Sequence, residues 1–153
     1  MENLTFFSAS EEDTESFGYQ LAEKLKAQGL SYAFIALYGE MGVGKTAFTR
    51  GFCRALGISA VHSPTYTVVN EYKGDTLSIF HFDLYRLEDE DDLYSIGFDD
   101  YLAREGLILC EWTEKIPEIV PNDAISVLIR RTKACESERE IEISFPDSLA
   151  LSL

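Results

Sequence analysis

The chain has 153 residues, of which 46% are hydrophobic and 26% charged, so we expect one folded domain over residues 1–153 and exclude a disordered chain. The net charge of −14 argues against strong unaided binding to RNA or DNA, and it reflects either solubility or an acidic face that docks on a basic protein. The sequence shows no membrane span, no signal peptide and no Cys-x-x-Cys pair among its three cysteines, which predicts a cytoplasmic protein with reduced thiols.

The N-terminal part predicts a strand, a helix and a second strand. The first strand is expected at residues 4–8, and the helix that follows ends at Gly29. One apolar stripe runs along this helix, at Phe17, Leu21 and Leu25. Residues 33–38 are apolar throughout, which is typical of a parallel strand covered on both faces.

Residues 39–46 read Gly-Glu-Met-Gly-Val-Gly-Lys-Thr and match the phosphate-binding pattern G-x-x-x-x-G-K-[ST]. Glycine lets the chain curl so that successive N–H groups point at one anion, and the helix predicted at 45–56 presents its positive end to the phosphates. Lys45 is expected to reach the β- and γ-phosphates, and the Thr46 hydroxyl to bind Mg²⁺. The loop residues predicted to bind the nucleotide are Gly39, Glu40, Met41, Gly42, Val43, Gly44, Lys45, Thr46 and Ala47.

The second half of the chain predicts further strands around an acidic, partly helical segment at 88–104. Residues 65–72 and 76–84 are expected to form an antiparallel hairpin, because Lys73-Gly74-Asp75 is a turn signal. Three more strands are predicted at 107–110, 124–130 and 140–145, the last two as a terminal antiparallel pair. The natural architecture is an α/β fold in which helices flank a mixed sheet.

A site that hydrolyses nucleotides needs acidic groups near Thr46, because Mg²⁺ prefers one or two carboxylates together with phosphate oxygens and waters. Asp83 ends an apolar strand, as a Walker B carboxylate does. Glu111 also ends an apolar run, and ligands of open α/β sheets bind at the carboxyl ends of strands. The predicted metal site therefore consists of Thr46, Asp83 and Glu111. Glu111 is expected to bind the metal directly, to bind it through a water molecule, or to orient the attacking water.

The segment 63–67, Ser-Pro-Thr-Tyr-Thr, follows the helix of the phosphate loop. In switch-type NTPases a threonine in this place senses the γ-phosphate and the metal. Thr65 is the first candidate for that role and Thr67 the second, whereas the alternative is an edge strand that uses Pro and Thr for local geometry. The predicted catalytic residues are Lys45, Thr65, Asp83 and Glu111.

Four other side chains allow two interpretations each. Trp112, the single tryptophan, is either partly buried in the core or a lid or stacking surface, and it is included among the predicted nucleotide-binding residues. His81 is interpreted as a packed strand histidine rather than a base. The role of His62 stays open, and Arg86 pairs either with nearby carboxylates or with phosphate.

The chain lacks an Asn-Lys-x-Asp motif, so ATP is expected rather than GTP. A small-molecule kinase built on the same loop is an alternative, although the acidic residues 88–92 do not resemble the arginine-bearing lid of such kinases. A second alternative is a nucleotide-gated adaptor, in which binding matters and turnover is incidental.

Four motifs together resemble the bacterial TsaE (YjeE/YdiB) family. They are the phosphate loop at 39–46, Ser-Pro-Thr-Tyr-Thr at 63–67, His-Phe-Asp-Leu-Tyr-Arg at 81–86 and Cys-Glu-Trp at 110–112. The resemblance runs from about residue 5 to residue 130, and the tail at 131–153 carries no matching motif.

The resemblance implies a small three-layer P-loop NTPase domain with a mixed, largely parallel central sheet. It implies slow, Mg²⁺-dependent ATP hydrolysis that partners stimulate. The implied partners are the TsaD and TsaB proteins, which install threonylcarbamoyl on adenosine 37 of tRNA, so that this chain meets tRNA only through them and no membrane is involved. It also assigns Lys45 to the phosphates, Thr46, Asp83 and Glu111 to the metal, and Thr65 to the switch.

Overall fold

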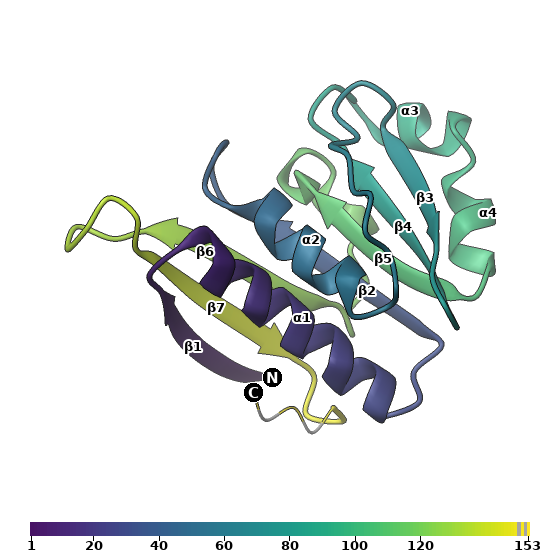
Figure 1. Ribbon diagram of the computed structural model, residues 1–153. Coiled ribbons are helices and arrows are strands. Elements are labelled where there is room, and N and C mark those ends of the chain that lie inside the picture. Colours follow the sequence, from purple (N-terminus) through teal and green to yellow (C-terminus); the bar gives the residue numbers. More distant parts are fainter. Residues whose placement is uncertain (150, 152) are drawn as a thin grey trace.

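A computed structural model describes residues 1–149, 151 and 153, and its elements are shown in Figure 1. Within these residues one seven-stranded sheet has the order β1-β7-β6-β2-β5-β4-β3. The strands are β1 (Glu2–Ser8), β2 (Tyr32–Tyr38), β3 (Val69–Lys73), β4 (Ser78–Asp83), β5 (Gly106–Glu111), β6 (Ile125–Arg131) and β7 (Arg139–Phe145). The helices are α1 (Glu11–Ala27), α2 (Lys45–Arg54), α3 (Glu90–Ser95) and α4 (Phe98–Ala103), with 3₁₀ turns η1 (Thr113–Lys115) and η2 (Pro117–Ile119).

The centre of the sheet is parallel and its edges are antiparallel. Strands β6, β2, β5 and β4 run parallel to their neighbours, whereas β3 pairs antiparallel with β4, and β7 pairs antiparallel with both β6 and β1. Every residue of β5 is buried, as expected of a central parallel strand covered on both faces. The predicted mixed sheet, its hairpin and its terminal antiparallel pair are confirmed.

Helices cover both faces of the sheet and give three layers (Figure 1). One buried cluster joins α1 and α2 to the sheet and includes Leu25, Phe48 and Ile35. A second cluster joins α3 and α4 to the opposite face, where the rings of Phe82 and Phe98 meet edge to face at 5.3 Å. The sheet therefore separates two cores. Helix α2, which directly follows the phosphate loop, packs in the first of them.

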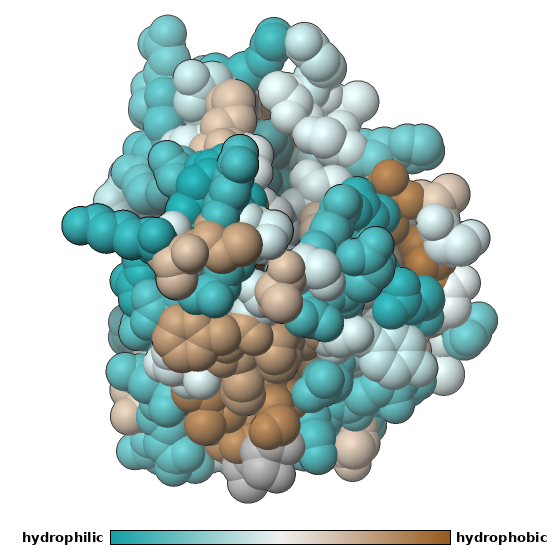
Figure 2. All heavy atoms as spheres, turned by 60° about the vertical axis from the view of Figure 1, so that its left-hand side comes forward, coloured by the Kyte–Doolittle hydropathy of each residue, from teal (hydrophilic) through white to brown (hydrophobic). Residues whose placement is uncertain are grey.

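The side of the molecule on which β1 and α1 lie shows a gathering of hydrophobic side chains (Figure 2). The rings of Phe6 on β1 and Phe17 on α1 lie 4.9 Å apart, and both pack against the first core. Leu4, Leu149 and Leu153 are also partly buried against this core. These contacts close the edge of the core between α1 and the outermost strand.

Within the described residues, no helix has the length and apolarity needed to span a membrane.

The predicted strand at 65–72 is wrong for its first four residues. The strand begins at Val69, and residues 65–68 form a turn in which the Val68 N–H donates to the Pro64 carbonyl at 2.7 Å. Val68 has a φ of 69°, a left-handed conformation that a β-branched residue rarely adopts. High β-propensity suggested a strand here, but local turn hydrogen bonds override that preference.

Two glycines allow α1 and α2 to pack in close contact. A Cβ atom at Gly51 would lie 1.8 Å from the Glu15 carbonyl oxygen, and one at Gly18 would lie 2.1 Å from the Phe48 carbonyl oxygen. Both obstacles are backbone atoms, so the helices themselves would have to separate. Since α2 carries Lys45 and Thr46, this contact also fixes the end of the helix that meets the phosphate loop.

Gly51→Ala is expected to lower the free energy of unfolding by about 3 kcal/mol, because the steric clash outweighs the gain of about 1 kcal/mol in helix propensity. This loss corresponds to a fall in Tm of about 6–12 °C, measured by thermal denaturation. Ser16→Ala, at an exposed position of α1, is the control and should stay within about 0.5 kcal/mol of the unchanged protein. Equal melting of the two variants would contradict the close helix contact.

Candidate functional site

The loop between β2 and α2 has the backbone geometry that an anion-binding loop needs. Gly39, Gly42 and Gly44 have φ values of 145°, 76° and 126°, which side-chain-bearing residues rarely adopt. Gly44 caps α2 without a side-chain hydrogen bond, and the first turn of α2 contains no acidic residue. In contrast, Ser10 caps α1 and acidic residues fill its first turn. The positive end of α2 is thus left available for an anion.

Two arginines of the β6–β7 hairpin form hydrogen bonds to this loop. The Arg131 guanidinium donates to Glu40 Oε1 at 2.7 Å and to the Gly42 carbonyl at 3.2 Å. Arg139 Nε donates to the Val43 carbonyl at 2.8 Å. Neither arginine was predicted, because nothing in their sequence neighbourhood indicates that the terminal hairpin lies beside the phosphate loop.

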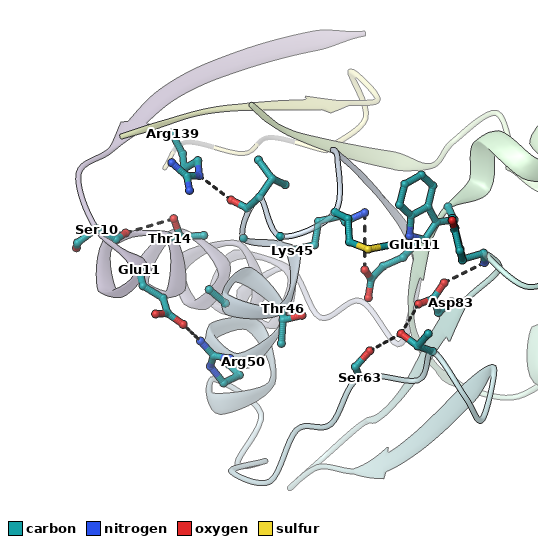
Figure 3. Close-up of a pocket in the computed structure, with 18 of the residues that line it drawn as sticks. Ser10, Glu11, Thr14, Lys45, Thr46, Arg50, Ser63, Asp83, Glu111 and Arg139 are labelled. Carbon is teal, nitrogen blue, oxygen red and sulfur yellow. Dashed lines mark hydrogen bonds and ion pairs between the residues drawn. The ribbon is translucent and has the colours of Figure 1, made fainter. Parts of the chain in front are cut away.

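The loop opens onto a cleft of about 560 Å³ (Figure 3). Of the predicted site residues, those lining it are Met41, Gly42, Val43, Gly44, Lys45, Thr46, Ala47, Thr65, Asp83, Glu111 and Trp112. Gly39 and Glu40 do not line it: Gly39 packs against the Ile129 carbonyl, and Glu40 pairs with Arg131. The lining also includes Ser10, Glu11, Thr14, Arg50, Ser137 and Arg139, none of which was predicted as a site residue.

Asp83 and Glu111 lie side by side in this cleft. They are register partners at the ends of the parallel strands β4 and β5, and their exposed fractions are only 5% and 6%. Asp83 accepts hydrogen bonds from the Thr65 hydroxyl at 3.0 Å and from the Tyr85 N–H at 2.9 Å. The structure therefore brings Thr65, Asp83 and Glu111 together, as their sequence positions suggested, while their chemical roles stay predictions.

Lys45 lies buried between the loop and the carboxylates. Its Nζ donates to the Gly39 carbonyl at 2.7 Å, lies 4.0 Å from Glu111 Oε1, and sits 4.1 Å from the centre of the Trp112 ring. Burial lowers the pKa of Lys45, and the nearby carboxylates of Glu111, Glu114 and Asp83 oppose that shift without cancelling it. The ammonium group is thus held in a place where its charge is not fully compensated.

This lowered pKa predicts a pH-dependent difference between the protein and a Lys45→Met variant. Below the folded-state pKa the buried charge opposes folding, so the variant should have the higher Tm at pH 7 without nucleotide. As the pH rises through the lowered pKa towards the ordinary lysine pKa of 10.5, Lys45 loses its proton more readily in the folded than in the unfolded state, and the difference in Tm should shrink. Thermal denaturation of both proteins from pH 7 to pH 10 measures this; a difference that widens with pH would contradict it.

The structure refines the residues whose role was open. Trp112 is partly buried, as one interpretation predicted, and it also lines the cleft, with a φ of 62° and its ring 5.0 Å from that of Tyr85. Its role as a lid or stacking surface stays a prediction. Arg86 stacks on Tyr66 at 4.3 Å and does not line the cleft. The Thr67 hydroxyl donates to Asn70, away from Asp83, which leaves Thr65 as the candidate switch residue.

The two histidines occupy different environments. His81 is fully buried, as the packing interpretation predicted, but its Nε2 also lies 2.6 Å from Glu111 Oε2. His62 is exposed, and its backbone atoms bond to Tyr72. His81 thus contacts one of the two carboxylates of the site, and the sequence did not indicate this contact.

Comparison with known proteins gives a consistent result. A family model described as "Threonylcarbamoyl adenosine biosynthesis protein TsaE" matches residues 8–141. The protein named "tRNA threonylcarbamoyladenosine biosynthesis protein TsaE" from Bacillus subtilis (strain 168) is 36% identical over 142 residues, which cover 92% of this chain and 85% of that protein. Its namesake from Haemophilus influenzae is 40% identical over 131 residues, covering 84% and 83%. A crystal structure of Bacillus subtilis YdiB aligns with a TM-score of 0.77 and 29% identity, over 97% of this chain and 89% of that one.

Proposed function

Because this chain belongs to the TsaE family, we propose that it is an ATP-hydrolysing protein that acts in the threonylcarbamoyladenosine modification of tRNA. The observation that carries the proposal is the cleft itself. In it, an uncapped helix N-terminus and a buried lysine face two neighbouring carboxylates. This combination suits a bound nucleoside triphosphate better than any neutral ligand.

The phosphates of ATP would lie over the loop residues Met41–Thr46. There the backbone N–H groups and the free end of α2 favour negative charge. Lys45 would exchange its hydrogen bond to the Gly39 carbonyl for one to a phosphate oxygen, which would add to the negative charge that the nearby carboxylates already supply to this buried ammonium. The absence of an Asn-Lys-x-Asp motif favours ATP over GTP as the substrate.

The donors present in the cleft fit Mg²⁺. Thr46, Asp83 and Glu111 offer a hydroxyl and two carboxylates, which are oxygen ligands of the kind that Mg²⁺ prefers. The described residues contain no group of three or more His, Cys, Asp or Glu that could hold a metal. That fits a cation which relies largely on phosphate oxygens and waters. Bound Mg²⁺ would neutralise the charge that develops on the phosphates during transfer.

Thr65 links the metal site to the segment 63–67. Its hydroxyl occupies one oxygen of Asp83, while the Tyr85 N–H occupies the other. A cation at Asp83, or a water molecule bound to it, would compete with the Thr65 hydroxyl. Binding of ATP with Mg²⁺, and its later hydrolysis, would therefore change the contacts of the segment 63–67. Tyr66, in the middle of the segment, is 82% exposed and could carry such a change to a partner.

We propose the TsaD and TsaB proteins as these partners, with tRNA met only through them. The run Glu88-Asp89-Glu90-Asp91-Asp92 lies at and before α3 and is largely exposed, which favours a basic protein surface over tRNA phosphates. We also propose the cytoplasm as the compartment, since all three cysteines are free thiols.

An ATPase assay with and without the purified TsaD–TsaB pair tests this function. Slow release of phosphate by the chain alone and faster release with the pair are expected. The chain alone should not bind tRNA tightly at physiological salt. No hydrolysis under either condition would refute the enzymatic assignment, and tight tRNA binding by the chain alone would refute the indirect contact.

A further inference from the structure

His81 has contacts that packing alone does not explain. It lies on β4 two residues before Asp83, so both side chains point to the same face of the sheet. Its side chain is fully buried, and Nε2 lies 2.6 Å from Glu111 Oε2 on the neighbouring strand. On the same strand and face, Ile79 fills its place in the core with an apolar side chain.

The contact predicts which ring nitrogen of His81 carries a proton. A carboxylate oxygen accepts hydrogen bonds, so a hydrogen bond across the 2.6 Å between Nε2 and Oε2 requires an Nε2–H group as the donor. Nδ1 of His81 is buried and has no hydrogen-bond partner among the described residues. Burying a polar ring with one unpaired nitrogen costs free energy, so we expect the other nitrogen of His81 to have a functional role.

The two carboxylate oxygens of Glu111 have different partners, and this difference indicates the role of His81. Oε2 is held by His81, and Oε1 is directed towards Lys45 Nζ, 4.0 Å away at the cleft. We propose that His81 is a positioning residue that fixes the Glu111 carboxylate so that one oxygen faces the metal site. The inference rests on the proposed function, because it assumes that Glu111 serves a nucleotide-bound cation. Groups of this kind, bonded to a metal ligand, typically change metal affinity by about 10–100-fold when removed.

The test compares His81→Phe, which keeps a ring but has no donor, with His81→Gln, which keeps an N–H donor. Each full-length variant is titrated with Mg²⁺ in the presence of a non-hydrolysable ATP analogue. The readout is the fluorescence of Trp112, the single tryptophan and the neighbour of Glu111. The Mg²⁺ midpoint is expected to rise about tenfold or more in His81→Phe and clearly less in His81→Gln. Binding of the analogue in EDTA should be the same in all three proteins.

Ile108→Val is the matched control, because it removes a buried methyl group from the other face of β5. It should lower thermal stability without moving the Mg²⁺ midpoint. An unchanged midpoint in His81→Phe, or equal shifts in both His81 variants, would overturn the inference. If the unchanged protein shows no metal-dependent signal with the analogue, the proposed function itself fails, so the two failures are distinguishable.

A second measurement leaves His81 in place, so it does not depend on how well the variants fold. Nitrogen NMR of the ¹⁵N-histidine-labelled protein, which has two histidines, reports which ring nitrogen of His81 is protonated. Protonation at Nε2 is expected. A neutral ring protonated at Nδ1 could not donate to Glu111 and would overturn the inference.

Discussion

Replacing Lys45 with alanine is expected to abolish measurable ATP hydrolysis, with kcat reduced by about 10²-fold or more. The Nζ group is the buried cation between the phosphate loop and the carboxylates, and the loop amides alone cannot supply its charge. Among the described residues, the hydrogen-bond partner of this side chain is the Gly39 carbonyl of its own loop, and its contact with Glu111 on β5 is an ion pair at 4.0 Å. We therefore expect a folded but inactive protein, measured by phosphate release and by thermal denaturation.

Lys73→Ala is the control for the loss of one positive charge. Lys73 is exposed at the end of the edge strand β3 and does not line the cleft. Its variant should hydrolyse ATP like the unchanged protein. Retained turnover in Lys45→Ala would show that the lysine of the phosphate loop does not take part in the reaction.

Asp83→Asn and Glu111→Gln should each reduce Mg²⁺-dependent turnover by about 10²-fold, whereas nucleotide binding falls much less. Each change removes a charge and preserves the shape of a side chain that is more than 90% buried. The phosphates would still meet the loop amides and Lys45, which explains why binding survives. Kinetics over a range of Mg²⁺ concentrations, together with calorimetric titration of a non-hydrolysable ATP analogue, measure the two effects separately.

Glu105→Gln, at an exposed carboxylate outside the cleft, is the matched control and should leave both quantities unchanged. If neither cleft variant alters turnover, the metal site has been assigned to the wrong residues. If both lose nucleotide binding as severely as turnover, the two carboxylates serve the fold of the cleft rather than the metal.

The alternative functions predict different products. A small-molecule kinase would transfer phosphate to a metabolite, whereas a hydrolase releases phosphate from ATP without any acceptor. A nucleotide-gated adaptor would support repeated modification cycles with a variant that binds ATP but does not hydrolyse it. Release of phosphate without any acceptor separates the hydrolase from the kinase. Glu111→Gln, assayed for tRNA modification over repeated cycles, separates the hydrolase from the adaptor.

Much of the site could be predicted from local sequence. The loop at 39–46 encodes its own backbone, because three of its glycines adopt φ values that other residues avoid. Asp83 and Glu111 each end an apolar run, and adjacent parallel strands bring such ends to one edge of the sheet. Their proximity therefore followed from two short strands and the rule that ligands bind at that edge.

The rest depends on contacts between distant parts of the chain. Arg131 and Arg139 reach the phosphate loop only because β6 pairs with β2, and no residue pattern in 131–153 reveals that pairing. The bond between His81 and Glu111 likewise needs the register of β4 against β5. At residues 65–68 the composition favoured a strand, whereas the turn after Pro64 directs Thr65 towards Asp83.

A reconstituted modification reaction shows whether ATP hydrolysis in this cleft supports tRNA modification. Threonylcarbamoyladenosine is quantified by mass spectrometry in tRNA treated with TsaD, TsaB, the threonylcarbamoyl donor and this chain, over many turnovers. We predict sustained modification with the unchanged chain and none beyond the level without it for Lys45→Ala. Equal modification by the two proteins would contradict the account.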